Sequence, residues 1–482
     1  MPSPWPPTGR SARSGSCNWA IMTSPRAAGH EPAPRRPPAV PDHRVDLMRI
    51  TILAVGTHGD VRPFIALSHG LQARGHEVTI TTGRNFEGLI RGAGIGFSPM
   101  TADYEKLMRN SPEMVEAGNN LFKGTKLMRR LLMDMASHWA EEGRAACKDT
   151  DLIIGQGSGT VLALSLAEAL KVPSVQVQFQ PITPCRDIPP VMLPPMPFRL
   201  PGFLNMGLYQ GLRFTIWQLF KDAINDVVRK DLGLKPVTYS ELYFDDNPDR
   251  RRVLYAYSEQ VVPRSRDWTA MAQVTGYWFL DEADAWTPPE DLANFLAAGD
   301  KPVYIGFGSM LTQKAEDVTR KVLTAVKETG CRAVLATGWG GLAADPALAD
   351  PNVFVLKSAP HDWLFPRMAA AIHHGGAGTT AAACRAGIPS LIMPFITEQA
   401  FWSARLEEKG IAAPRLNRKT VTARDFQRGL ARLLDPAMKA RAEALGTKIR
   451  AENGVERAIA QLEAWNLLPN AAPQPAEDHA LA

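Results

Sequence analysis

The chain has 482 residues, of which 45% are hydrophobic and 21% are charged, and its formal net charge at pH 7 is +5. This composition is ordinary for a globular protein with two full cores, and it excludes a fibrous or wholly disordered chain. The small, dispersed excess of positive charge gives no reason to expect nucleic acid as a partner. The 5 cysteines lie far apart without Cys-x-x-Cys spacing, which argues against a disulfide framework or a zinc site.

The chain ends are predicted to lack a packed core. Residues 1–47 are rich in Pro and Arg, and we expect a disordered extension there unless Met48 is the true start. Residues 468–482 are expected to be a loose tail. No apolar run reaches the ~20 residues that span a bilayer, and no signal-peptide pattern is present. We therefore expect a cytoplasmic location in a reducing compartment, with peripheral contact at the inner membrane face as a further expectation.

From Met48 onward, short apolar runs alternate with longer amphipathic stretches, which is the pattern of βα units with a parallel sheet. The first set of predicted strands covers Arg49–Val55, Glu77–Thr82, Asp151–Ile154, Ser174–Phe179 and Val253–Tyr257. The second set covers Val303–Phe307, Ala333–Ala336, Val353–Leu356, Ala369–Ile372 and Ser390–Met393. Two facing, doubly wound α/β domains are therefore expected, with ligands bound in the cleft outside the carboxyl ends of the strands.

A proline-dense stretch interrupts the first set of strands. Residues 183–203 hold 7 prolines and are predicted to form a long ordered loop, because proline excludes a regular helix or a central strand. The amphipathic stretch that follows, Leu204–Phe220, is interpreted as a helix with its apolar face on the core. The alternative is that it forms a wall of an apolar pocket or a patch that dips into a membrane surface.

A turn rich in histidine and glycine occupies residues 373–380, between a predicted strand and the predicted helix Thr379–Ala386. Glycine lets backbone N–H groups approach a ligand closely, and the start of a helix favours anions. The threonine hydroxyls and one histidine add donors. An ordinary Gly-rich turn is the alternative interpretation. The candidate phosphate-binding residues are His374, Gly375, Gly376, Gly378, Thr379 and Thr380.

A second glycine-containing turn, residues 56–63, follows the first predicted strand. Asp60 lies at the carboxyl end of that strand, where its side chain is expected to point into the cleft. His58 precedes it by two positions and so lies on the same side of an extended segment. The alternative interpretation is that Asp60 is only the N-cap of a helix that begins before Pro63.

Several segments resemble the UDP-dependent glycosyltransferases of the GT-B fold. The segments that carry this resemblance are residues 360–366, 373–380, 385–389 and 394–402. Residues 275–281 and 303–310 are similar to the subgroup of sterol 3-beta-glucosyltransferases and of bacterial enzymes that glycosylate lipids and polyketides. The resemblance runs from about Met48 to about Gly410 and is weaker between about residues 100 and 250.

The resemblance implies two facing Rossmann-like domains with an interdomain cleft. The N-terminal domain would bind the acceptor, and the C-terminal domain would bind the nucleotide-sugar. A last helix would cross back onto the first domain. The predicted boundaries are 48–282 for the N-terminal domain, 283–302 for the linker, 303–436 for the C-terminal domain and 437–467 for the crossing helix.

The resemblance also implies an inverting transfer of a hexose, expected to be glucose, from a UDP-sugar to a hydroxyl of a sterol, lipid or polyketide. Asp60 falls on the position of the general base, with His58 as an alternative base or an orienting residue. Further donor-site residues are Gly308 and Ser309, Ser358 and His361 near uracil, and Glu398 and Gln399 near the sugar hydroxyls. The family usually shows Asp-Gln where this chain has Glu-Gln, and a first-turn helix acid is the alternative interpretation of Glu398.

Neither a metal nor a cofactor is expected besides the UDP-sugar donor, because the fixed donors already face the diphosphate. The acidic stretches 245–247 and 281–284 are interpreted as solvated loop charges rather than a metal motif. A UDP-sugar epimerase and a non-catalytic nucleotide-sugar-binding protein remain as alternatives. A Rossmann dehydrogenase is disfavoured, since no strand is followed by Gly-x-Gly-x-x-Gly with an acidic residue about 20 positions later.

Overall fold

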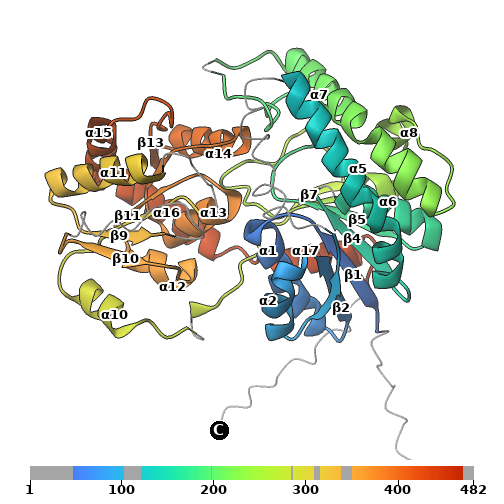
Figure 1. Ribbon diagram of the computed structural model, residues 1–482, viewed down its shortest axis with the longest axis horizontal. Coiled ribbons are helices and arrows are strands. Elements are labelled where there is room, and N and C mark those ends of the chain that lie inside the picture. Colours follow the sequence, from blue (N-terminus) through green and yellow to red (C-terminus); the bar gives the residue numbers. More distant parts are fainter. Residues whose placement is uncertain are drawn as a thin grey trace, which may run out of the picture. The chain divides into compact units, whose positions relative to one another are not determined.

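Two parallel β-sheets organise the chain (Figure 1). The computed structural model describes residues 47–101, 121–157, 159–196, 198–283, 286–308, 315–337 and 350–469. All of them belong to one compact unit, Arg44–Ala482. The strand orders are β3-β2-β1-β4-β5-β6-β7 in the first sheet and β10-β9-β8-β11-β12-β13 in the second. The doubly wound α/β fold expected from the sequence is confirmed.

All five predicted strands of the first set are present in the first sheet. The sheet also holds two strands that the sequence did not predict, β3 and β7. Both are short, and β3 has a glycine and a proline at its ends, so neither shows a clear apolar period. The strands are β1 (Arg49–Ala54), β2 (Glu77–Thr82), β3 (Gly96–Pro99), β4 (Leu152–Gln156), β5 (Ser174–Gln178), β6 (Val253–Tyr255) and β7 (Ala272–Val274).

The second sheet repeats this design with all five strands predicted for it. The one addition among the described residues is the two-residue strand β13. The strands are β8 (Val303–Gly306), β9 (Ala333–Ala336), β10 (Val353–Leu356), β11 (Ala370–His373), β12 (Ser390–Ile392) and β13 (Ala412–Ala413). Strand order reverses beside β1 in the first sheet and beside β8 in the second. Ligands of such sheets bind at the carboxyl ends of the strands where the order reverses.

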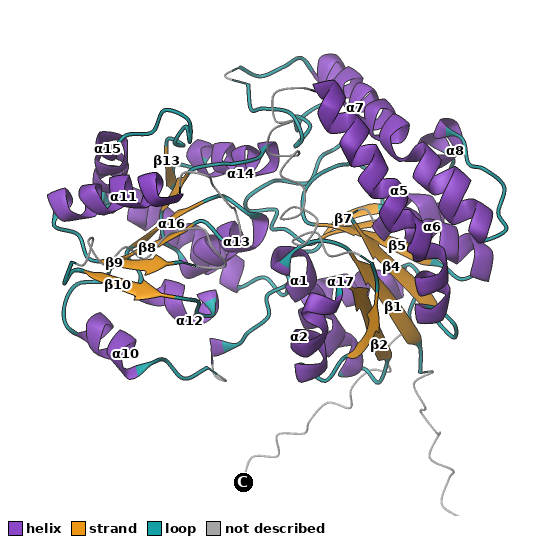
Figure 2. Cartoon of the chain, in the orientation of Figure 1, coloured by secondary structure: helices purple, strands orange, loops and turns teal. Residues whose placement is uncertain are grey.

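Helices connect the strands and flank both sheets (Figure 2). Those that precede the linker are α1 (His58–Gln72), α2 (Glu87–Gly92), α5 (Leu121–Ala146), α6 (Gly159–Leu170), α7 (Gly202–Asp222), the π-helical turn η3 (Ala223–Arg229), α8 (Tyr239–Phe244) and α9 (Pro248–Arg251). The later ones are α10 (Glu290–Ala297), α11 (Ala315–Thr329), α12 (His361–Leu364), α13 (Ala377–Ala386), α14 (Thr397–Glu408), α15 (Ala423–Leu433), α16 (Pro436–Arg450) and α17 (Gly454–Ala464). No helix in the described part of the chain is long and apolar enough to cross a membrane.

Two connecting segments differ from the prediction. The linker expected at 283–302 contains a helix, α10, whose Leu292 is fully buried with residues of the second domain. The sequence prediction missed this helix because prolines precede and follow it. The single crossing helix expected at 437–467 is two helices, α16 and α17, interrupted at residues 451–453.

The break before α17 lets this helix pack on α1 in the first domain. Ile459 and Leu462 of α17 are fully buried in the core that contains β1 and α1. Arg74, just after α1, forms ion pairs with Glu456 and Glu463 of α17. Gly454 begins α17 directly against the backbone of Tyr277, and a side chain at this position would overlap the Tyr277 carbonyl group.

We expect Gly454→Ala to lower the free energy of unfolding by about 1–3 kcal/mol, because the added methyl group meets immobile backbone. Urea titration of the purified protein measures the change. Gly211→Ala is the matched control, since a methyl group there has no neighbour within 4 Å. That substitution should be neutral or stabilise by about 0.5–1 kcal/mol because alanine loses less entropy in a helix. Equal unfolding midpoints for the two variants would contradict the tight contact.

Candidate active site

A cavity of about 1320 Å³ is lined by residues from both sheets. It lies at the carboxyl ends of the strands, since residues that directly follow β1, β4, β5, β8 and β11 all contribute to its wall. Sites for one small molecule usually occupy about 300–1,000 Å³. This cavity therefore has room for two substrates at once.

Asp60 lies in the first turn of α1 and lines the cavity. Its Oδ2 accepts hydrogen bonds from the Thr57 backbone N–H at 2.7 Å and from the Thr57 hydroxyl at 3.1 Å. Its Oδ1 accepts from Gln156 Nε2, at the end of β4, at 2.9 Å. The N-cap is Thr57, so the interpretation of Asp60 as the N-cap is wrong. Both oxygens are instead held in place from two different strand ends.

The environment of Asp60 makes its carboxylate more basic. Burial raises the pKa of Asp60, and the hydrogen bonds from Thr57 and Gln156 lower it by less. Burial disfavours the charged form, so the ionised carboxylate takes up a proton more readily than one in water. His58 lies on the same wall, where its ring meets the edge of Phe86 with centroids 4.9 Å apart. The two residues proposed for base chemistry are therefore both present at the cavity.

The Gly-rich turn forms the opposite wall. Helix α13 starts after Gly376, and His374, Gly376, Gly378 and Thr379 all line the cavity. A methyl group built on Gly378 would lie 3.9 Å from the Cα of Gly59. The N-termini of α13 and α1 therefore approach each other closely across the cavity. Both helix dipoles direct their positive ends to this place, which favours an anion between them.

Glycines make room for the His374 imidazole in this turn. A Cβ at Gly308, whose φ is +63°, would lie 3.0 Å from His374 Cε1. A Cβ at Gly376 would lie 2.5 Å from His374 Nε2. Burial lowers the pKa of His374 to about 4, so the ring is neutral at pH 7. Its Nδ1 is buried without a hydrogen-bond partner among the described residues, and a bound anion could supply one.

Two described residues predicted for phosphate contact, Gly375 and Thr380, do not line the cavity. Gly375 has φ +90° and is packed behind the wall against Ile392. Thr380 is fully buried, and its backbone N–H already donates to the Gly376 carbonyl at 2.9 Å. Ser309 lies outside the described residues. The sequence pattern could not separate Thr379, which faces the cavity, from Thr380, one helical step further round.

Ser358 and His361, which the sequence predicts to lie near uracil, line the cavity after β10. The His361 ring stacks on Phe365 with centroids 4.3 Å apart and meets the edge of Tyr304 at 5.6 Å. Burial first, and then the charge of Arg62, lowers the pKa of His361 to about 4. His361 is therefore a neutral, aromatic part of the wall, which suits contact with a planar base.

Glu398 and Gln399 begin α14 and line the cavity. Burial, and then the charge of Asp60, raises the pKa of Glu398 to about 7. With its amide oriented to satisfy both groups, Gln180 donates to Glu398 Oε1 at 2.6 Å and Oε2 at 3.0 Å. Gln399 Oε1 accepts from the backbone N–H groups of Phe395 at 2.7 Å and Ile396 at 3.3 Å. Of the two polar atoms of the Gln399 side chain, Nε2 is then the one left to bind a ligand.

Charged residues that the prediction treated as solvated also belong to the site. Glu282 forms an ion pair with Arg62, and Asp281 forms one with Arg385; all of these residues line the cavity. The interpretation of 281–284 as solvated loop charges is therefore wrong for Glu282, whose side chain is 29% exposed, whereas the Asp281 side chain is 66% exposed. The partners are more than 100 residues apart in the chain, so no local pattern could reveal the pairs.

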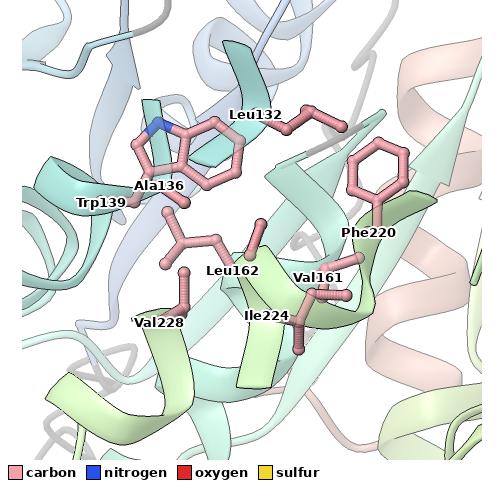
Figure 3. Close-up of a pocket in the computed structure, with 9 residues that line it drawn as sticks. Leu132, Ala136, Trp139, Val161, Leu162, Phe220, Ile224 and Val228 are labelled. Atoms are coloured by element: carbon pink, nitrogen blue, oxygen red, sulfur yellow. The ribbon is translucent and has the colours of Figure 1, made fainter. Parts of the chain in front are cut away.

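A second cavity among the described residues is too small to be a ligand site. The small apolar cavity between α5, α6 and η3 is lined by side chains such as Leu132, Trp139 and Phe220 (Figure 3). Its volume is about 10 Å³, which is too small for an organic ligand. Among the described residues, no group of three His, Cys, Asp or Glu side chains is arranged to hold a metal ion.

Comparison with known proteins agrees with this geometry. The family description "Glycosyltransferase family 28 N-terminal domain" matches residues 50–186. The description "Erythromycin biosynthesis protein CIII-like, C-terminal domain" matches residues 341–464. These two segments cover the turn with Asp60 and the turn with His374.

Similar curated proteins include fungal sterol 3-beta-glucosyltransferases. The protein of Aspergillus oryzae is 36% identical over 425 residues, which are 86% of this chain and 30% of the relative. The protein of Cryptococcus neoformans is 36% identical over 447 residues, which are 86% of this chain and 27% of the relative. The chain thus spans less than a third of the length of these relatives.

Solved structures of similar fold are GT-B glycosyltransferases. The glycotransferase of kitacinnamycin has a TM-score of 0.65 at 20% identity, covering 88% of this chain and 100% of the other. The calicheamicin glycosyltransferase CalG4 has a TM-score of 0.62 at 19% identity, covering 87% and 98%. VinC, determined with dTDP, has a TM-score of 0.61 at 20% identity, covering 86% and 99%. The expected GT-B fold is therefore confirmed.

The raised pKa of Glu398 predicts a pH dependence of stability. Between pH 4.5 and about 7 this carboxyl is protonated in the folded state and ionised in the unfolded state. The contribution of this carboxyl to the free energy of unfolding therefore falls as pH rises through this range. We expect the Tm of the wild type to decrease relative to that of Glu398→Gln over the same range. Thermal melts at several pH values measure the difference, with Glu328→Gln, at an exposed position, as the control. If the Tm of the wild type and that of Glu398→Gln changed in parallel with pH, the raised pKa of Glu398 would be refuted.

Proposed function

We propose that this chain, whose residues 50–186 and 341–464 match the glycosyltransferase family 28 N-terminal and EryCIII-like C-terminal domains, is an inverting glycosyltransferase. It would move a hexose, glucose by preference, from a UDP-sugar to a hydroxyl of an apolar acceptor. The observation that carries the proposal is the approach of two turns across one cavity. One turn carries a partly buried carboxylate, Asp60, and the other is a helix N-terminus with His374, whose Nδ1 has no hydrogen-bond partner among the described residues.

The second domain supplies donors for a departing diphosphate. Since the Thr380 N–H is already bonded to Gly376, the amides left for a ligand are those of Ala377, Gly378 and Thr379. His374 adds a side-chain donor beside them. One fixed donor aimed at developing negative charge is typically worth about 3–4 kcal/mol of barrier. With several such donors, we propose that no metal ion is needed for the leaving group.

The first domain supplies the base. Asp60 would take the proton of the acceptor hydroxyl as that oxygen attacks the anomeric carbon. Thr57 and Gln156 hold the carboxylate in place, so it needs no rearrangement before the reaction. General-base assistance of this kind contributes about 10²- to 10⁴-fold in rate. Attack from the Asp60 wall and departure toward the α13 wall place the two groups on opposite faces of the sugar, which inverts its anomeric configuration.

An apolar acceptor fits the wall beside Asp60. Phe179, Trp278, Phe279 and Leu280 line this part of the cavity. The similarity to sterol 3-beta-glucosyltransferases supports a sterol or a related polycyclic alcohol. Glu398 and the Nε2 of Gln399 are proposed to bind the sugar hydroxyls. At pH 7, near its pKa, Glu398 can donate as well as accept a hydrogen bond.

The proposal is tested by incubating the protein with UDP-glucose, alone and with a panel of sterols. dTDP-glucose is included because one structure of similar fold was determined with thymidine diphosphate. UDP release that depends on the acceptor, together with a glycoside of inverted anomeric configuration, supports transfer. Conversion of the donor sugar without acceptor would instead show an epimerase, and nucleotide binding without any product a non-catalytic binding protein.

We expect Asp60→Asn to lower kcat by about 10²- to 10⁴-fold, because the amide cannot take the proton of the acceptor. The affinity for UDP should stay nearly unchanged, since Asp60 lies on the wall opposite the diphosphate donors. Steady-state kinetics and calorimetric titration with UDP measure the two quantities. A matching loss of UDP affinity would mean that Asp60 supports the fold of the cavity rather than the proton transfer.

His374→Ala should weaken UDP binding by about 10- to 100-fold, because it removes a donor to a charged group. His138→Ala is the matched control, since this exposed histidine on α5 is absent from the cavity wall. Calorimetry with UDP, at the same pH for both variants, gives the comparison. Unchanged affinity in His374→Ala would remove this residue from the proposed phosphate site.

A further inference from the structure

The loop before α7 and α7 itself have an unusual charge pattern. Between Asp187 and Asp222 the sequence contains no acidic residue, and its basic residues are Arg199, Arg213 and Lys221. Residues 363–397 also lack acidic residues, but they include the buried strands β11 and β12, whereas residues 188–221 expose several large side chains. A long surface segment without any carboxylate does not repel an anionic partner.

This segment also exposes large apolar side chains. In the loop, Met192 is 50% exposed and Phe198 is 64% exposed. At the start of α7, Phe203 is 72% exposed and Leu204 is 44% exposed. Single exposed hydrophobic residues are normal, but a cluster of them marks an interaction surface. We call the set Met192, Met196, Phe198, Phe203, Leu204 and Phe214 the apolar platform.

The outer face of α7 carries no charge. Its exposed positions are Phe203, Leu204, Gly207, Gly211, Phe214 and Thr215. At both glycines a side chain would meet no atom within 4 Å, so this face is open. The opposite face buries Asn205, Tyr209 and Trp217 in the protein. A helix with one face on a protein core normally shows charged or polar residues on the other. Helix α7, which Figure 1 shows beside α5, is therefore apolar or neutral on the side turned away from the core.

The base of the loop is fixed, so the apolar side chains are held outward rather than left to collapse. Tyr255 Oη accepts from the Thr183 N–H at 2.8 Å, and Trp268 Nε1 donates to the Thr183 carbonyl at 3.1 Å. Further along, the Arg186 N–H donates to Asp267 at 2.6 Å. Because the base of the loop is fixed, less conformational entropy is lost when the apolar side chains bind to a partner surface.

The loop that carries part of the platform begins beside the cavity. Strand β5 leads into Phe179 and Gln180, which line the cavity, and the chain then runs through Ile182 into the loop. Arg199 contributes an almost fully exposed guanidinium group, since its ion pair with Glu408 at 3.0 Å leaves 94% of its side chain accessible. Such an exposed pair is weak and leaves the arginine able to meet other anions.

We propose that residues 188–221 form a docking surface for an anionic lipid bilayer. Phe198, Phe203 and Leu204 enter the interface between headgroups and acyl chains, while Arg199 and Lys221 meet the lipid phosphates. The uncharged face of α7 lies along the bilayer surface. The mouth of the cavity is then held near the bilayer, where an apolar molecule can pass from the lipid into the protein.

The test is co-sedimentation of the protein with vesicles of phosphatidylcholine and phosphatidylglycerol in equal parts. The wild type should bind these vesicles and bind pure phosphatidylcholine vesicles more weakly. The double variant Phe198→Ser/Phe203→Ser should bind about 10- to 100-fold more weakly, because the apolar area that enters the lipid is lost. The control Val355→Ser/Leu434→Ser changes two exposed apolar residues elsewhere and should bind as the wild type does.

Equal binding of the wild type and the Phe198→Ser/Phe203→Ser variant would overturn the proposal. It would also be overturned if that variant turned a dimer into a monomer in sedimentation velocity while vesicle binding stayed unchanged, since the platform would then contact a second copy. Thermal melts establish that both double variants are folded. The assay contains neither UDP-sugar nor acceptor, so its result does not depend on the proposed transferase activity.

Discussion

The close approach of two helix N-termini is the constraint on which the rest of the site depends. Gly378 of α13 faces Gly59 of α1 across the cavity, and a Cβ built on Gly378 would lie 3.9 Å from the Cα of Gly59. Both helix dipoles point their positive ends into the same space, an arrangement that is unfavourable until negative charge lies between them. Asp60 supplies part of that charge. A diphosphate would supply the rest, which explains why an anionic substrate fits a cavity that already contains carboxylates.

The two sheets fix the positions of these two helix N-termini. Each domain places its functional turn after the strand at which its sheet order reverses, β1 in one case and β11 beside β8 in the other. The domains are held together by a shared apolar core in which Tyr257 meets the edge of Trp402, with ring centroids 6.1 Å apart. Helix α17 packs against α1, and this contact attaches the end of the second domain to the first domain. The distance between Asp60 and the α13 turn is thus set by packing far from the cavity.

Most of the fold was predictable because buried parallel strands are continuous apolar runs bounded by turn residues. All ten predicted strands are present, whereas β3, β7 and β13 lack a continuous run of large apolar residues, since their sequences are Gly-Phe-Ser-Pro, Ala-Gln-Val and Ala-Ala. The turns with Asp60 and His374 were found because glycine, histidine and a strand end coincide in the local sequence. The hydrogen bonds from Gln180 to Glu398 and the ion pair of Arg62 with Glu282 were not predicted, since the partners lie far apart in the chain. Only the tertiary structure reveals such contacts.

The protonation states of residues on the two walls of the cavity depend on each other. Burial raises the pKa of Glu398, and the charge of Asp60 raises it further, because two nearby carboxylates disfavour the state in which both are ionised. Burial keeps the His374 ring neutral by lowering its pKa to about 4. A diphosphate beside His374 acts in the opposite direction, since an adjacent negative charge favours the imidazolium. Nucleotide binding should therefore draw a proton onto His374 on the C-terminal wall. On the other wall, the hydrogen bonds from Thr57 and Gln156 oppose the effect of burial, since they favour the ionised form of Asp60. In the proposed reaction one wall would receive the proton of the acceptor and the other would receive the departing anion.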